Sequence, residues 1–330
     1  MLRRNTKIIS LICATILSVS LLAGCSSSNE KSENTSSNAK VEEKADDSKE
    51  KKDTNEKYAN EEYIVSIDWL KENLDSDKVI IVDTRDNKDY KKGHIKNAIN
   101  VTWQDLSNME GKGGDEKWAT LLEKDALSAK LSELGLAKDK TIVLYTSKNG
   151  WGEDGRVEWS LKSAGYKDVK MLNGGIDLWE SEKLETSKED VPFKKAEVKV
   201  DKIDESLNIT TDELKGKVDK IKVIDTREKD EYEGATKYGE ARGGHIPGAI
   251  NITFNTLYNE DGTLKSQSEI EKIMTDNGIK KDDEIVTYCT SGIRSGHMAM
   301  VLKLAGYENV KNYDQSYIRW AAINDLKVEK

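Results

Sequence analysis

The sequence predicts an α/β fold made of two related domains, each a mostly parallel sheet flanked by helices. Two observations support this class. Short runs of β-branched residues alternate with amphipathic stretches, as is typical of parallel sheets covered on both faces. The chain also contains an internal repeat, and each half is longer than about one hundred residues, which indicates a duplicated domain rather than a solenoid of small units.

The N-terminus has the features of a secretory leader. Residues 1–7 are basic, residues 8–22 are mostly apolar, and residues 22–25 resemble a bacterial lipobox that ends at Cys25. This resemblance implies a lipoprotein signal peptide at 1–24 and a diacylglycerol group on the Cys25 sulfur. The lipid would anchor the protein to the extracytoplasmic face of the bacterial cell membrane. A single membrane span is the alternative, but the apolar run is short for a bilayer core that takes about 20 residues.

Residues 25–60 are rich in Ser, Asn, Glu, Lys and Asp and almost lack large apolar groups. Such a segment buries too little surface to fold alone, so we expect a disordered tether. The repeat starts after it. Residues 82–85 match 224–227, residues 93–103 match 244–254, and residues 164–166 match 305–307. These matches place a first domain at 61–184, a linker at 185–209 and a second domain at 210–328.

The second repeat shows its elements most clearly. Residues 222–224 and 285–288 are typical of buried strands, residues 268–274 carry apolar side chains at helical spacing, and residues 298–302 continue an apolar helix. Ligands of parallel sheets bind beyond the carboxyl ends of the strands. The residue after the strand that ends at Tyr288 is Cys289.

Cys289 is predicted to lie between a strand end and a helix start. Unpaired N–H groups and the positive dipole end of a helix N-terminus stabilise an anion there, and in such settings a cysteine pKa falls from about 8.5 to roughly 3.5–7.5. Gly292 allows a tight turn, and Arg294 adds a cation. Cys13 leaves with the leader and Cys25 is lipidated, so Cys289 has no disulfide partner. An inert buried cysteine is the alternative.

The two repeats differ at the position of Cys289. The residue that matches Cys289 in the first repeat is Thr146, so that repeat has no nucleophile. Its loop at 149–155 is rich in glycine, and anion binding by this loop is an alternative that its spacing supports only weakly.

Three motifs in order, at 223–227, 244–249 and 289–294, resemble the rhodanese family. The last has the pattern Cys-x-x-Gly-x-Arg. The resemblance implies two tandem rhodanese-like domains, the first non-catalytic. It also implies transfer of sulfane sulfur from thiosulfate or 3-mercaptopyruvate, through a Cys289 persulfide, to a thiophilic acceptor such as cyanide or a thiol. Family members often carry basic residues directly after the cysteine. Thr290 and Ser291 stand there in this chain, which leaves the donor open.

Substrate contacts are expected mainly from the loop. Its backbone N–H groups would stabilise the anionic sulfur, and Arg294 is our first choice for the donor's anionic end, with a surface ion pair as the alternative. Arg242 is a plausible second contact. Arg227 has a counterpart, Arg85, in the repeat without a nucleophile, which favours a structural role, and a substrate contact stays open. The expected substrate-binding set is Arg294, Arg242, Arg227, Thr290, Ser291, Gly292, Ile293 and Ser295.

Aromatic and imidazole side chains allow two interpretations each. Tyr317 and Trp320 lie in a segment that resembles the family's C-terminal aromatic stretch, and would either wall the cleft or pack in the core. His94 and His245 hold matched positions, which favours a shared structural hydrogen bond. His297 follows the loop and would face either the loop or the core. The histidines lack zinc-motif spacing, so we expect neither a metal nor a cofactor.

The net charge and the length of the cysteine loop help to weigh alternative functions for this protein. Charged residues make up 34% of the chain and the net charge is −9, which argues against a nucleic-acid partner. A phosphatase or arsenate reductase is one alternative, but phosphatase loops place Arg six residues after the cysteine, and here Ser295 is sixth. A non-enzymatic surface lipoprotein that carries sulfur or binds a ligand is the other.

Overall fold

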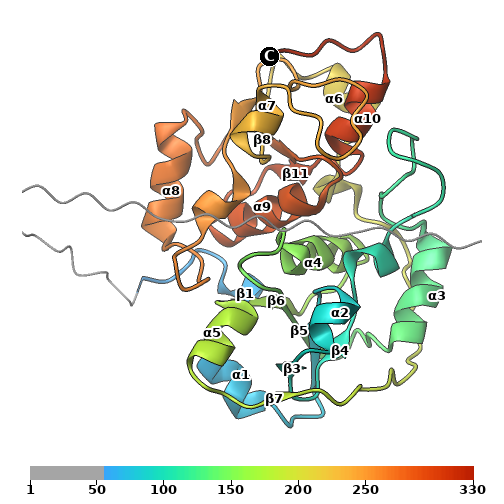
Figure 1. Ribbon diagram of the computed structural model, residues 1–330, viewed down its shortest axis with the longest axis vertical. Coiled ribbons are helices and arrows are strands. Elements are labelled where there is room, and N and C mark those ends of the chain that lie inside the picture. Colours follow the sequence, from blue (N-terminus) through green and yellow to red (C-terminus); the bar gives the residue numbers. More distant parts are fainter. Residues whose placement is uncertain (1–55) are drawn as a thin grey trace, which may run out of the picture. The chain divides into compact units, whose positions relative to one another are not determined.

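The computed structural model describes residues 56–330, and these residues form two parallel sheets with helices packed around them (Figure 1). The sheet of the first repeat has the order β1-β6-β5-β2-β4, and that of the second has the order β11-β10-β8-β9. Every strand pair in both sheets is parallel. The predicted fold class is therefore confirmed. The predicted signal peptide, Cys25 and most of the tether lie outside the described residues.

The strands are short, as the β-branched runs predicted. Those of the first sheet are β1 (Ile64–Val65), β2 (Val79–Asp83), β4 (Ile99–Asn100), β5 (Thr141–Tyr145) and β6 (Val169–Leu172). Those of the second are β8 (Lys222–Asp225), β9 (Ile250–Asn251), β10 (Ile285–Tyr288) and β11 (Val310–Asn312). A separate antiparallel pair joins β3 (His94–Ile95) to β7 (Thr186–Ser187).

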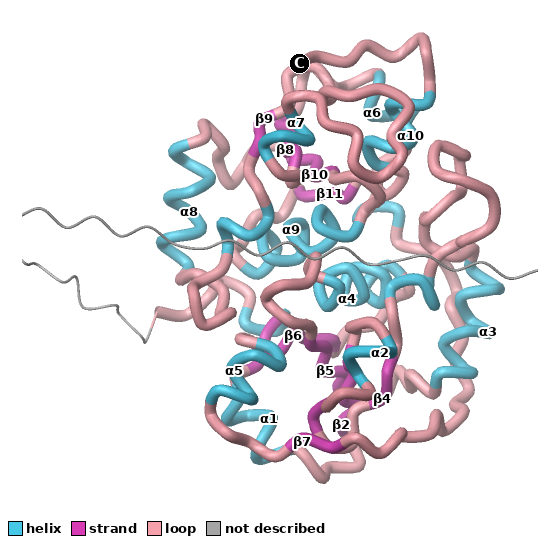
Figure 2. The backbone as a smooth tube through the Cα atoms, in the orientation of Figure 1, coloured by secondary structure: helices cyan, strands magenta, loops and turns pink. Residues whose placement is uncertain are grey.

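Helices cover both sheets (Figure 2). In the first repeat they are α1 (Ile67–Asn73), α2 (Asn87–Tyr90), α3 (Lys124–Leu134), α4 (Glu153–Ser163) and α5 (Gly175–Ser181). In the second they are α6 (Thr211–Lys215), α7 (Lys229–Tyr232), α8 (Gln267–Asp276), α9 (Ile293–Leu304) and α10 (Ser316–Ala322). Short 3₁₀ turns occupy Glu61–Tyr63, Trp103–Leu106, Glu205–Leu207 and Phe254–Leu257.

Matched polar networks support the same strand ends in both repeats. In the second, Asp225 lies opposite Tyr288 in the sheet register, and it accepts hydrogen bonds from the Tyr288 hydroxyl (2.6 Å) and from the Arg227 guanidinium (2.6 Å). In the first, Asp83 accepts from Tyr145 and Arg85 in the same way. The structural pairing of Arg227 with Asp225 that the repeat favoured is confirmed.

The two matched histidines also share their surroundings. Nδ1 of His94 lies 2.9 Å from the Tyr90 carbonyl oxygen, and Nδ1 of His245 lies 2.9 Å from that of Tyr232. Each imidazole stacks on the ring of that tyrosine. The shared structural hydrogen bond predicted from their repeat positions is therefore confirmed.

The repeats meet through α4 and α9, which lie side by side between the two sheets (Figures 1 and 2). Close approach explains two glycines at this contact: a Cβ on Gly155 would lie 2.6 Å from the Cα of His297, and one on Gly296 would lie 3.3 Å from the Cα of Arg156. Arg156 reaches across to Asp314, with Nη1 2.5 Å from Oδ1, and both side chains are buried. A buried ion pair thus joins the first repeat to the second.

Segments predicted as connections are packed against the domains. Tyr58, within the predicted tether, donates its hydroxyl to the Lys265 carbonyl at 2.7 Å. In the predicted linker, Ser187 pairs with the first repeat in β7, and Val198 and Val200 are buried in the core of that repeat. Both ends of the first domain are therefore held by packing.

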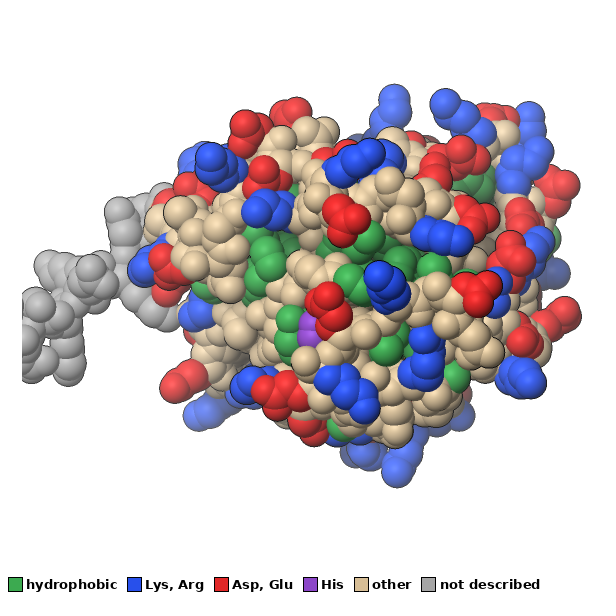
Figure 3. Space-filling model, turned by 90° about the horizontal axis from the view of Figure 1, so that it is seen from above, with side chains coloured by type: hydrophobic (Ala, Val, Ile, Leu, Met, Phe, Trp, Pro, Cys, Tyr) green, Lys and Arg blue, Asp and Glu red, His purple; other side chains and the backbone are tan. Residues whose placement is uncertain are grey.

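The surface mixes charges of both signs. Figure 3 shows basic and acidic side chains interspersed on one face, around a central band of apolar groups. No helix among residues 56–330 combines the length and the apolar character that crossing a bilayer requires.

Candidate active site

Cys289 directly follows β10, and α9 begins at Ile293 with Gly292 as its N-cap. Gly292 has φ 86°, a left-handed conformation that disfavours side chains, and a Cβ there would lie 2.9 Å from the Asp314 carbonyl oxygen. The N–H of Gly292 donates to the Cys289 sulfur at 3.2 Å. The strand-loop-helix arrangement predicted for this segment thus places a backbone donor on the thiol.

The surroundings of Cys289 favour its thiolate. Burial by itself raises the pKa of the thiol, but the Arg294 charge and the backbone N–H groups of Ser295 and Ser291 outweigh it, so the pKa lies below its ordinary value. The Ser295 hydroxyl donates to Asn312 Oδ1 at 2.7 Å. Its single hydrogen is therefore committed to Asn312, and the stabilisation rests on Arg294 and the backbone.

Arg294 is buried and carries its own counter-ion. Its Nη1 and Nη2 bind the two carboxylate oxygens of Glu231 at 2.7 and 2.8 Å, and Nη2 also donates to the Thr290 hydroxyl at 3.0 Å. Burial raises the pKa of Glu231, but the hydrogen bonds and charge of Arg294 lower it by more than burial raises it. The net pKa is below the ordinary value, so the carboxyl is ionised at neutral pH. The alternative of an ion pair is confirmed in part, since Arg294 pairs with Glu231, but both partners are buried rather than at the surface. Arg294 therefore stabilises the thiolate with a charge that Glu231 balances.

A cavity of about 200 Å³ opens over the thiol. It is much larger than the space that one water molecule needs. It lies between the repeats, and most of its lining is aromatic or aliphatic. The lining residues are Trp103, Met109, Trp118, Trp151, Tyr238, Cys289, Thr290, Ser291, Ile293, Arg294 and Ile318.

Five of the predicted site residues therefore meet at one cavity, namely Cys289, Thr290, Ser291, Ile293 and Arg294. Gly292 contributes its N–H to the sulfur, and Ser295 lies behind the loop.

Arg227 and Arg242 are not brought to the cavity. Arg227 is fully buried, binds Asp225 and the Gly244 carbonyl, and lies with its guanidinium 4.1 Å from the ring centroid of Tyr317. Arg242 donates to four backbone carbonyls at the end of the second repeat, those of Trp320, Ala321, Ile323 and Leu326. The donors of Arg242 and the Nε and Nη2 of Arg227 are used inside the fold, whereas Nη1 of Arg227 is buried without a partner among the described residues. Both residues thus have structural positions.

The apolar wall is made by residues that the sequence did not single out. Tyr317 and Trp320 pack in the core of the second repeat. Trp103, Trp118 and Trp151 of the first repeat take the expected place, with Tyr238 and Ile318 of the second. Three of the chain's seven tryptophans lie at this one cavity. The sequence does not show this clustering, because Trp103 begins a 3₁₀ turn and Trp151 lies in the loop before α4.

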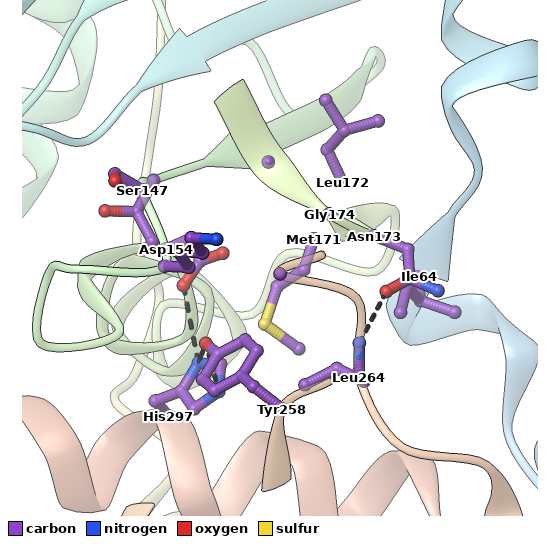
Figure 4. Close-up of a pocket in the computed structure, with 14 residues that line it drawn as sticks. Ile64, Ser147, Asp154, Met171, Leu172, Asn173, Gly174, Tyr258, Leu264 and His297 are labelled. Carbon is purple, nitrogen blue, oxygen red and sulfur yellow. Dashed lines mark hydrogen bonds and ion pairs between the residues drawn. The ribbon is translucent and has the colours of Figure 1, made fainter. Parts of the chain in front are cut away.

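A second, smaller pocket adjoins the Thr146 loop (Figure 4). Here His297 lies 2.7 Å from the Tyr258 hydroxyl through Nε2 and 3.3 Å from Asp154 Oδ1 through Nδ1. The pocket measures about 20 Å³, which leaves room for about one water molecule. His297 therefore faces the contact between the repeats rather than the thiol.

The glycine-rich loop itself is filled by an acidic side chain. The Glu153 carboxylate accepts hydrogen bonds from the Thr146 hydroxyl (2.8 Å) and from the Trp151 N–H (3.0 Å). An anion site in this loop has less support, because the Glu153 carboxyl group already takes these two donors, and burial raises its pKa. Across residues 56–330, no cluster of three or more His, Cys, Asp and Glu side chains is arranged to hold a metal ion.

Comparison with known proteins agrees with this geometry. The Rhodanese-like domain family matches residues 66–182 and 210–323. The chain belongs to the rhodanese family. It is 31% identical to the thiosulfate sulfurtransferase of Corynebacterium glutamicum, over 83% of this chain and 92% of that protein. It is 34% identical to a sulfur carrier protein of Thermus thermophilus, over 83% of this chain and 98% of the relative.

Among solved structures, the anaerobic ergothioneine biosynthesis enzyme of Chlorobium limicola, in complex with trimethyl histidine, has a similar fold. The TM-score is 0.75 at 24% identity, over 83% of this chain and 71% of that one. Together with the family match, the relatives identify this rhodanese as a sulfurtransferase.

Proposed function

We propose that this sulfurtransferase moves sulfane sulfur from thiosulfate or 3-mercaptopyruvate to a thiophilic acceptor through a persulfide on Cys289. The observation that carries the proposal is the Cys289 sulfur itself, which accepts the Gly292 N–H under a cavity that also exposes Arg294. A lowered pKa increases the fraction of the thiol that is in its nucleophilic form at neutral pH. The name of the Corynebacterium glutamicum relative supports thiosulfate as a donor.

The chemistry has two steps. The Cys289 thiolate attacks the outer sulfur of thiosulfate, the S–S bond of the donor breaks with its electron pair on the departing sulfite, and Cys289 carries the persulfide. With 3-mercaptopyruvate the C–S bond breaks, and the carbon takes a proton to give pyruvate. The acceptor then attacks the outer sulfur of the persulfide and releases the Cys289 thiolate. Loop N–H groups stabilise the anionic sulfur in both steps, as an oxyanion hole does.

Mass spectrometry tests this proposal. Incubation with thiosulfate or 3-mercaptopyruvate should add one sulfur atom to the Cys289 peptide, and cyanide should remove it with repeated turnover as thiocyanate. Cys289→Ser is the control, because it keeps the size of the side chain without its nucleophile. A Cys289→Ser protein that still forms thiocyanate at the native rate would overturn the proposal.

A sulfur carrier is the second candidate, and the name of the Thermus thermophilus relative favours it. A carrier takes up one sulfur per Cys289 and keeps it in the presence of cyanide or small thiols. Loading followed by discharge only to a partner protein would therefore identify a carrier. The phosphatase alternative has less support, because the residue six positions after Cys289 is Ser295, where phosphatase loops have arginine.

We also propose that Cys25 carries a lipid that anchors the protein to the extracytoplasmic face of the membrane. The basic and apolar leader followed by Leu22-Ala23-Gly24-Cys25 supports this placement. Fractionation of cells tests it. The protein should be found with membranes, and Cys25→Ala should prevent lipid attachment, whereas Cys25→Ala protein that still carries the lipid would contradict the proposal.

A further inference from the structure

The cavity over Cys289 has a composition that a small dianion does not need. Seven of its eleven lining residues are aromatic or aliphatic, and the tryptophans come from three separate segments of the first repeat. Apolar lining with a few convergent polar groups is typical of sites that bind organic molecules. Sulfane-sulfur donors such as thiosulfate make no use of aromatic walls. The walls therefore indicate a second molecule with an apolar body.

The mouth of the cavity is built for contact with such a body. Trp151 of the first repeat and Tyr238 of the second meet edge to face, with ring centroids 5.7 Å apart. Both are unusually exposed for large aromatic side chains, at 43% and 44%. Exposed aromatic groups next to a cavity offer apolar area at little cost in side-chain entropy. They combine solvent exposure with a place in the cavity lining, so they can contact a molecule bound over the thiol.

The charges around the thiol disfavour an acceptor that is itself negatively charged. Glu231 neutralises Arg294, which is the one cationic residue in the cavity lining. Glu240 is also buried, and its Oε1 lies 3.5 Å from the hydroxyl of Thr290, a lining residue. With Cys289 ionised or carrying a persulfide, the groups at the thiol end of the cavity sum to a negative charge. Between acceptors with the same body, a carboxylate is therefore disfavoured relative to an uncharged or cationic group, and a cation also gains from aromatic faces.

We infer that the acceptor half of the reaction uses an organic thiol with an apolar body and no negative charge, bound between Trp151, Tyr238 and the inner tryptophans. This inference rests on the proposed function, because it concerns discharge of the Cys289 persulfide. The acceptor thiolate attacks the outer sulfur, the S–S bond to Cys289 breaks, and the Cys289 sulfur leaves as a thiolate. The acceptor's thiol proton goes to solvent, and the product is an organic persulfide, with no net oxidation.

A series of thiols with one common body tests the inference. The full protein is loaded with sulfur from polysulfide, and discharge is followed by mass spectrometry with benzyl mercaptan, its 4-aminomethyl derivative and its 4-carboxylate derivative. The small thiol 2-mercaptoethanol lacks the apolar body. We expect kcat/KM for the first two to exceed that for the carboxylate and for 2-mercaptoethanol by about tenfold or more, which corresponds to about 1.4 kcal/mol.

Single-residue variants test the aromatic wall and the negative charge of Glu240 separately. Trp151→Ala and Tyr238→Ala should each lower kcat/KM for benzyl mercaptan several-fold more than they lower kcat/KM for cyanide. Phe193→Ala is the matched control, because Phe193 is an exposed aromatic residue outside the cavity. Glu240→Gln should raise kcat/KM for the carboxylate derivative relative to the amine.

The outcomes are distinguishable. If no persulfide forms on Cys289, the proposed function itself fails. If the persulfide forms and is discharged to cyanide, but all four thiols react equally and Trp151→Ala changes nothing, then only the inference about the acceptor is overturned.

Discussion

Replacing Arg294 by Met tests the electrostatic account of the thiolate. A guanidinium within about 4–6 Å lowers the pKa of an acidic group by about 1–3 units. Because Glu231 shares the charge of Arg294 through two hydrogen bonds, we take the low end of that range. The pKa of Cys289 should therefore rise by about one unit, which corresponds to about 1.4 kcal/mol and a tenfold smaller thiolate fraction below the pKa.

The rate of iodoacetamide alkylation measures this fraction, read as a function of pH on the Cys289 peptide. Arg294→Met also leaves Glu231 buried without its partner, and such a loss destabilises a fold by about 3–5 kcal/mol. The double variant Arg294→Met with Glu231→Leu removes both charges and should recover part of the stability, while the alkylation profile stays shifted to higher pH. A folded double variant whose profile coincides with that of the native protein would refute the role of Arg294.

Three further predictions concern the thiol and the contact between the repeats. Cys289→Ser should abolish sulfur transfer without lowering the melting temperature, because the two side chains have similar size; measurable transfer would contradict this. The folded-state pKa of Cys289 is lowered, so its contribution to stability is present above the unfolded pKa and lost as the pH falls through the folded value. Native protein should therefore lose stability relative to Cys289→Ala as the pH falls from the unfolded pKa of about 8.5 through the folded value, by at most about 1.4 kcal/mol per pH unit in chemical denaturation, and a constant difference would argue against the shift. Asp314→Asn should break the buried pair with Arg156 and lower the melting temperature by about 10 °C, on the basis of about 3–5 kcal/mol for such a loss; an unchanged calorimetric melting temperature would show that the pair adds no stability.

Local sequence patterns were sufficient to predict the strand and helix that flank the site and to identify the nucleophile. The strand at 285–288 and the helix that follows it were predicted from residue types with clear periodicity, and Cys289 lies between them as expected. The matched positions of Arg85 and Arg227 indicated a structural role from the sequence alone. Each of these inferences depends on neighbours in sequence or on the internal repeat.

Contacts between residues far apart in the chain were not predictable in this way. Arg242 was predicted as a substrate contact, but it binds carbonyls of its own repeat about 80 positions away. Trp151 lies in a loop of the repeat without a nucleophile, and only the packing of α4 on α9 brings it to the thiol of the other repeat. Side chains whose partners are distant in the chain leave no periodic signal.

The loop of the first repeat shows what replaced the nucleophile. Counting back from the matched residues Ala164 and Ala305, Glu153 of α4 stands where α9 has Arg294, and Asp154 follows it, so the first repeat has acidic residues where the second has its cation. Thr146 stands in place of the thiol and donates to Glu153, whose carboxylate fills the loop. A thiolate in that setting would be destabilised by both carboxylates. The same loop presents Trp151 to the cavity over Cys289, so the repeat without catalytic chemistry supplies the apolar wall that discriminates among acceptors in our inference.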